Sequence, residues 1–218
     1  MIGNSLLTNE QEMFLNILSN VGCMSKEQAI HIMKDYLGMR TNSVNAAITN
    51  LSLRRLIKVS HDGDFITPGG FSVKESLKRN TVEDIGIMCH VYDKVIESGN
   101  SEDVKNNISF VFRPHSEFEF SFISEGEIYQ MIHIPKDQIF KMSVIQKKLE
   151  DQKKELKGAE NNGINVIPTT LFIFSVETDE ENILEAVESL ELEIPHCLIF
   201  MKSKEFNHSI EFSMYESK

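Results

Sequence analysis

The residues best suited to chemistry lie between positions 40 and 61, where uncharged polar side chains stand beside basic ones. Apolar residues within the segment 41–53 recur at the spacing of one helix face: Val44, Ala47, Ile48 and Leu51. The opposite face carries short hydrogen-bonding side chains: Asn42, Ser43, Asn45, Thr49 and Asn50. Such groups suit contact with the base edges or the phosphates of a nucleic acid.

Basic residues and a β-ribbon follow this predicted helix. Arg54 and Arg55 lead into a short strand that contains Lys58, and an Asp-Gly pair then gives a hairpin turn signal. The return strand is predicted at 65–68. Two helices, a third helix with a polar face and a ribbon form the pattern of a winged helix-turn-helix, which we predict at residues 1–72.

This arrangement predicts a surface that binds double-stranded DNA. The polar helix face would enter the major groove with Thr41, Asn42, Ser43, Asn45 and Thr49. The phosphate backbone or the minor groove would be contacted by basic residues around that helix and by the tip of the ribbon: Arg40, Arg54, Arg55, Lys58 and His61.

Two helices are predicted ahead of the polar-faced one. Residues 8–11 and 25–28 are capping boxes, in which Thr or Ser is followed three positions later by Gln. Gly22 and Gly38 are expected to end the helices that these boxes begin. The second helix is predicted to carry His31 on its outer, solvated face.

Composition excludes several classes of protein. The 218 residues are 41% hydrophobic and 25% charged, as in ordinary globular proteins. No apolar run is long enough to span a bilayer, and the first residues lack the pattern of a signal peptide. The cysteines, Cys23, Cys89 and Cys197, have no metal-ligand spacing. We therefore expect a cytoplasmic protein without a metal or another cofactor.

Charge is distributed unevenly along the chain, whose formal net charge is −11. Residues 1–80 hold 9 Lys+Arg and 7 Asp+Glu, whereas residues 81–218 hold 13 and 26. Such a step is expected if only the first part meets phosphates. Because this part is only weakly basic, we expect a homodimer that places two helices on two half-sites.

The first third of the chain resembles the winged helix domains of bacterial transcription regulators and of replication-relaxation proteins. The resemblance rests on a helix that ends in Leu-x-x-Arg-Arg-Leu-Ile, followed by a strand, an Asp-Gly turn and a strand that ends in Thr-Pro-x-Gly. It implies that the ribbon is the wing of a DNA-binding domain.

Residues 71–80 are predicted to be a polar connector, and residues 81–218 a second domain of mixed αβ type. Helices are predicted at 82–97, 137–157 and 179–190. Strands are predicted at 107–112, 118–122, 128–134, 169–176, 196–201 and 209–214. A buried strand, a capped helix and a second buried strand predict a βαβ unit with a parallel strand pair.

The order of these elements resembles the restriction-endonuclease-like fold, which replication-relaxation proteins join to a winged helix. The resemblance implies a metal site with an acid after a proline and an acid-x-Lys on the next strand. Here His115 follows Pro114, and residues 131–134 hold neither a carboxylate nor a lysine. We therefore expect a degenerate domain without catalytic activity.

The leading hypothesis is a DNA-binding regulator of transcription, plasmid replication or mobile-element transfer. Its second domain would serve dimerisation or respond to a protein or small-molecule effector. One alternative is a divergent metal-dependent nuclease that uses Glu117, Glu119 or Glu127. The other is a winged helix that docks another protein.

Overall fold

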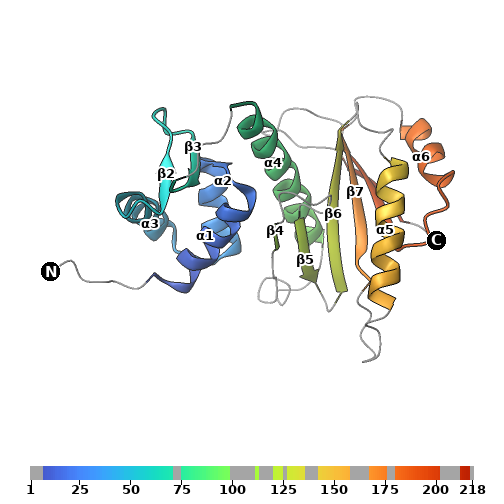
Figure 1. The fold of residues 1–218 in the computed structure, drawn as a ribbon, viewed down its shortest axis with the longest axis horizontal. Coiled ribbons are helices and arrows are strands. Elements are labelled where there is room, and N and C mark those ends of the chain that lie inside the picture. The colour runs from blue at the N-terminus through green and yellow to red at the C-terminus, as the bar shows by residue number, and fades with distance from the viewer. Residues whose placement is uncertain are drawn as a thin grey trace. The chain divides into compact units, whose positions relative to one another are not determined.

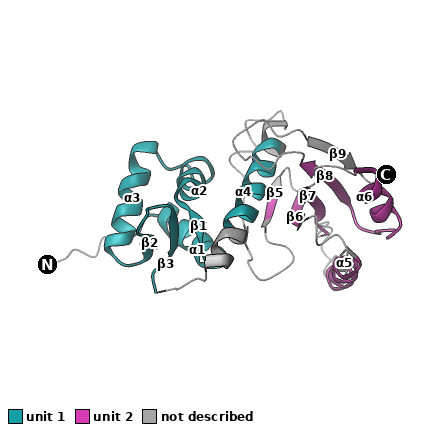
Figure 2. Ribbon diagram, turned by 90° about the horizontal axis from the view of Figure 1, so that it is seen from above, with its two compact units in different colours: residues 1–95, 112–114 teal, residues 96–111, 115–218 magenta. Residues whose placement is uncertain are grey.

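The computed structural model describes residues 7–70, 75–98, 111–112, 120–124, 127–135, 142–157, 167–175, 180–201 and 212–216. They form a mixed α and β structure with two sheets and two compact units (Figure 2). The first unit comprises residues 1–95 and 112–114, and the second comprises 96–111 and 115–218. The first unit thus reaches well beyond the boundary expected at residues 72–81.

The first two helices begin where the sequence predicted. Helix α1, Asn9–Val21, starts at the Thr8 capping box and ends at Gly22, whose φ of 75° is left-handed. Strand β1, Met24–Ser25, follows, and the second capping box then begins helix α2, Lys26–His31. The sequence did not predict β1, because two residues are too few to show a period.

Helix α2 does not continue as an α-helix to Leu37. From Ile32 to Tyr36 the chain forms a π-helical turn, η1, in which the amide of Leu37 donates to the carbonyl of Ile32 over 2.9 Å. Ile32 and Met33 still face the core. The apolar spacing is compatible with both helix types, so it could not reveal the wider turn.

Helix α3, Thr41–Leu53, buries the apolar face that the sequence predicted: Val44, Ala47, Ile48 and Leu51. Strands β2, Ile57–Val59, and β3, Phe65–Pro68, form the β-ribbon that follows it. Strand β1 pairs antiparallel with the other edge of β3, which gives a sheet in the order β1-β3-β2. Figure 1 shows α3 beside this ribbon.

Helix α4, Glu75–Ser98, begins inside the segment that was predicted to be a connector. Its residues Ile85, Met88 and Tyr92 are buried, and the side chain of Gln28 donates to the carbonyl of Val82 over 2.6 Å. These contacts explain why the helix belongs to the first unit as far as Val95. Within the described ranges no helix, this one included, is both long and apolar enough to cross a membrane.

The second unit contains a sheet in the order β4-β5-β6-β7-β8-β9. Its strands are Val111–Phe112, Phe120–Ser124, Glu127–Pro135, Thr169–Ser175, His196–Met201 and Phe212–Glu216. The helices are α5, Met142–Lys157, and α6, Glu180–Glu188. Strand β7 pairs parallel with both β6 and β8, whereas β5 and β9 pair antiparallel with their neighbours. The predicted βαβ unit, β7-α6-β8, is therefore confirmed.

Helices α5 and α6 pack on one face of this sheet (Figure 1). Their buried residues Ile145, Leu149, Ile183 and Val187 form one apolar cluster with alternate residues of strands β6, β7 and β8. In that cluster the rings of Phe174 and Phe200 stack with their centroids 5.4 Å apart. Residues on the opposite face of these strands, such as Leu171 and Ile173, are also buried. Burial on both faces accounts for the nearly continuous apolar sequence of β7 and β8.

Candidate nucleic-acid interface

The structure exposes every side chain of the predicted DNA-binding set: Arg40, Thr41, Asn42, Ser43, Asn45, Thr49, Arg54, Arg55, Lys58 and His61. It places them at the start of α3, along that helix, in the turn after it and on the β-ribbon. All these elements belong to the first unit. The residues are therefore all exposed on consecutive elements of one unit, from the start of α3 to the turn of the β-ribbon.

The side chains of α3 that point farthest from the core form a ridge: Asn42, Ala46, Thr49 and Leu53. We call these four residues the outward ridge; their spacing of four, three and four positions keeps them on one line of the helix. Leu53 is 80% exposed, the most exposed large apolar side chain among the described residues. Sequence reasoning singled out the polar members but passed over Ala46 and Leu53, which the same helical spacing could have placed there.

The chain turns sharply between α3 and β2, and its backbone is held tightly there. Arg55 has a left-handed φ of 61°, unusual for a residue with a side chain. The amide of Gly69, which directly follows β3, donates to the carbonyl of Leu56 over 2.8 Å, so the backbone at the end of the ribbon lies directly against this turn. A Cβ atom on Gly69 would lie 1.9 Å from the carbonyl oxygen of Arg55. Gly69 thus fixes the backbone that carries Arg54 and Arg55.

The tip of the β-ribbon is ordered by its own polar groups. The amide of Phe65 donates to the hydroxyl oxygen of Ser60 over 2.9 Å, and that hydroxyl donates to the carboxylate of Asp62. Gly63 takes the left-handed φ of 82° that the turn requires. His61 and Asp62, neighbours in the sequence, are both exposed at this tip.

The charge of this region differs from that of the whole chain. Between Asp35 and Asp62 there is no acidic residue, but there are four basic ones: Arg40, Arg54, Arg55 and Lys58. The larger unit that the structure defines is not basic, because residues 1–95 hold 10 Lys+Arg and 10 Asp+Glu. Positive charge is therefore local to the residues that flank α3, whereas the turn of the ribbon carries the exposed carboxylates of Asp62 and Asp64.

His31 lies between two carboxylates and is not simply solvated, as the sequence had suggested. Its Nδ1 is 2.8 Å from an oxygen of Asp35, and its Nε2 is 3.0 Å from an oxygen of Asp93 on α4. The hydroxyl of Tyr36 donates to the other oxygen of Asp93 over 2.9 Å. Because the two carboxylates meet opposite sides of the ring, they do not converge as metal ligands must. The hydrogen bonds of His31 and Tyr36 with Asp93 instead hold α2 and η1 against α4.

Both charged partners titrate abnormally in this cluster. The hydrogen bond with Asp93 raises the pKa of His31, against the lowering effect of burial. Burial acts to raise the pKa of Asp35, but hydrogen bonds from Lys34 and His31 outweigh it and hold that pKa below its usual value. The stabilisation from His31 is complete below its unfolded pKa of about 6.5 and is lost as pH rises through the folded pKa. That from Asp35 is complete above about pH 3.9 and is lost as pH falls.

Raising the pH from about 5.5 to about 8.5 is therefore expected to destabilise the wild-type protein more than the variant His31→Gln. The two proteins should differ by about 0.5–1 kcal/mol in this loss of the free energy of unfolding. The difference is small because His31 and its carboxylate partners are partly exposed and water screens their charges. Urea unfolding at both pH values measures it. The matched control is His61→Gln, which replaces an exposed histidine of the same unit. Its change in the free energy of unfolding between the two pH values should equal that of the wild type. An identical pH response in His31→Gln would contradict the role of the ion pairs.

The candidate nuclease residues fall largely outside the described part of the chain. Pro114, His115, Glu117 and Glu119 lie beyond the described residues, and only the backbone of Glu127, at the start of β6, is described. Among the described residues, no three His, Cys, Asp or Glu side chains are grouped so that they could hold a metal ion.

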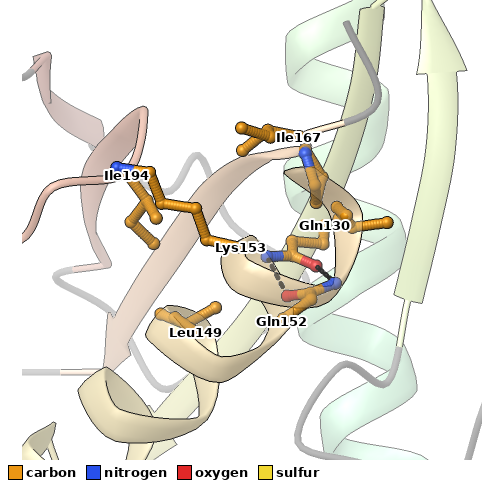
Figure 3. Close-up of a pocket in the computed structure, with 8 residues that line it drawn as sticks. Gln130, Leu149, Gln152, Lys153, Ile167 and Ile194 are labelled. Atoms are coloured by element: carbon orange, nitrogen blue, oxygen red, sulfur yellow. Dashed lines mark hydrogen bonds between the residues drawn. The ribbon is translucent and has the colours of Figure 1, made fainter. Parts of the chain in front are cut away.

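A small pocket lies between β6 and α5 of the second unit (Figure 3). Gln130 is buried there, and its side-chain nitrogen donates to the hydroxyl of Thr170 over 2.7 Å. Its amide also exchanges two longer hydrogen bonds, of 3.3 and 3.5 Å, with the amide of Gln152. Lys153 donates to the backbone carbonyl of Glu193 over 2.6 Å. The empty volume of about 180 Å³ includes open solvent, so the hollow is slight and these polar groups mainly join α5 to the sheet.

Comparison with known proteins does not assign the chain to a family. No protein-family model and no curated protein sequence matches it. Among solved structures, the restriction endonuclease FokI is similar over 90% of this chain and 44% of its own, with 14% identity and a TM-score of 0.27. The chain thus spans less than half the length of that protein. A likeness this weak carries no argument about fold or function.

Proposed function

We propose that the first unit is a winged helix-turn-helix domain that binds double-stranded DNA through α3 and the β-ribbon. The order of elements supports this proposal: helix α1, the short strand β1, the helical segments α2, η1 and α3, and a two-stranded ribbon in which β3 also pairs with β1. In this interpretation α3 is the recognition helix and the β2–β3 turn is the tip of the wing.

The observation that carries the proposal is the absence of acidic residues from the segment between Asp35 and Asp62 in so acidic a chain. Phosphate contacts dominate the affinity of proteins for DNA, and a carboxylate near the backbone weakens it. Helix α3 and the turn after it therefore suit this approach better than the tip of the ribbon, which carries Asp62 and Asp64. Arg40 stands at the start of α3, whereas Arg54, Arg55 and Lys58 follow its end. Both ends of the uncharged helix face thus have a cation that can reach a phosphate.

The second unit would then supply assembly or regulation. We propose a restriction-endonuclease-like fold without a working metal centre, supported by the antiparallel β5-β6 pair and the following parallel strands. A homodimer would present two copies of α3 to two half-sites, which compensates for the few cations in one copy. The process would be transcription, plasmid replication or transfer of a mobile element, with a protein or small molecule as effector.

Replacing Arg54 and Arg55 together by alanine is expected to weaken binding to all duplexes by a similar factor. Each lost phosphate contact should also reduce the slope of log affinity against log salt by about 0.9, so the double variant should lose up to about 1.8. Fluorescence anisotropy with labelled duplexes at several salt concentrations measures both quantities.

The matched control for this experiment is the double variant Lys147→Ala with Lys148→Ala. These lysines are also adjacent and exposed, but they lie on α5 of the second unit. The control should keep the wild-type affinity and salt slope. If neither double variant changes DNA binding, or if the wild-type protein retards no duplex at low salt, α3 and the ribbon are not a DNA-binding surface, and a protein-docking role is favoured instead.

A further inference from the structure

We infer that α3 recognises A·T base pairs, and that much of this selectivity comes from contact between apolar side chains of the outward ridge and the methyl group of thymine. The inference rests on the proposed DNA-binding function and adds the class of sequence that is bound. It follows from which groups the ridge presents and which it lacks.

The middle and the end of the ridge present carbon. Ala46 has only a methyl group, and Leu53 exposes an apolar side chain at the last position of α3. The hydroxyl of Thr49 donates to the carbonyl of Asn45 over 2.9 Å, so its hydrogen is already used within the helix. In the major groove only thymine offers an apolar group, its C5-methyl, as a partner for such side chains.

The start of the ridge presents an amide. Asn42 is exposed at the second residue of α3, and Asn45 and Asn50 flank the ridge on either side. An asparagine amide can donate to N7 and accept from the N6 amino group of adenine in a bidentate pair. The same helix face can therefore contact both partners of an A·T pair, adenine through amides and thymine through carbon.

The ridge has nothing that matches a G·C pair equally well. Guanine presents two acceptors, which are best bound by Arg or Lys, and cytosine presents an amino group, which is best bound by Asp or Glu. From Thr41 to Leu53 the helix contains none of these four residue types. The nearest cations, Arg40 and Arg54, stand just beyond its two ends, where they suit the phosphates.

The test begins with selection of binding duplexes from a random library. Each thymine of the enriched duplex is then replaced singly by deoxyuridine, which keeps the hydrogen bonds of the base pair but lacks the methyl group. We expect enrichment of A·T pairs and, for at least one thymine, a loss of affinity of about 4-fold on removal of the methyl group. This measurement needs no protein variant.

The variant Leu53→Ala assigns the contact. It should bind the thymine duplex several-fold more weakly than the wild type does, and it should no longer distinguish thymine from deoxyuridine at one position. Met13→Ala, which truncates an exposed apolar side chain on α1, is the matched control and should change neither value.

An enriched sequence rich in G·C pairs, or equal affinity for the thymine duplex and every deoxyuridine duplex, would overturn A·T recognition and leave DNA binding itself intact. Failure to enrich any duplex would instead reject the proposed DNA-binding function, and this inference with it. The two failures are therefore distinguishable.

Discussion

Gly69→Ala is expected to destabilise the first unit by about 3 kcal/mol or more and to abolish the DNA binding that we propose for it. The added Cβ would lie 1.9 Å from the carbonyl oxygen of Arg55 and 2.8 Å from its carbonyl carbon. These are backbone atoms, so no side-chain rotation can relieve the clash. Either β3 must move away from the turn after α3, or the left-handed conformation of Arg55 must change. Urea unfolding and fluorescence anisotropy with DNA measure the two effects.

Gly63→Ala is the matched control for this variant. Gly63 also lies in the β-ribbon, and its φ of 82° disfavours alanine, but a Cβ atom there would meet no atom within 4 Å. Its cost should be only the conformational one, about 1–2 kcal/mol. If Gly69→Ala were no more damaging than Gly63→Ala, the close approach of β3 to Arg55 would be refuted.

The sequence predicted α1, α2 and α3 well because the signals that begin and orient them are local. The capping boxes at Thr8 and Ser25 act within three residues, and both form in the structure. The apolar spacing in α3 likewise placed Val44 and Leu51 in the core. Local signals also sufficed for the parallel strands of the second unit, since a buried strand is apolar throughout.

Features that depend on distant residues escaped prediction. Strand β1 exists because Met24 and Ser25 meet Ile66 and Phe65 across the sheet. Helix α4 joins the first unit through partners more than 50 positions away, among them the contact of Gln28 with Val82. The position of His31 between two carboxylates also requires α4, which the sequence assigned to the other domain.

The candidate site likewise has features that local sequence predicts and features that depend on distant residues. Its polar members could be predicted because hydrogen-bonding residues on the exposed face of a helix are visible in the spacing. The close approach of the Gly69 backbone to the Arg55 carbonyl could not be predicted, because neither residue type reveals that the two backbones are in contact. Physical proximity across 14 positions is a property of the closed ribbon and not of the residues that form it.

The second large effect is expected from Phe174→Ala in the sheet of the second unit. Phe174 is fully buried on β7, where it stacks on Phe200 and joins the cluster beneath α5 and α6. Removing its ring leaves a cavity among side chains from several elements, which should cost about 3–5 kcal/mol of the free energy of unfolding. Thermal and urea unfolding measure this loss.

Two further variants separate cavity formation from a general sensitivity of this unit to substitution. Phe174→Leu keeps most of the apolar volume and should cost clearly less than the alanine variant. Val144→Ala truncates an exposed apolar residue on α5, and it should stay within about 0.5 kcal/mol of the wild type. A cost for Phe174→Ala no greater than that for Val144→Ala would mean that β7 is not the packed centre of the sheet.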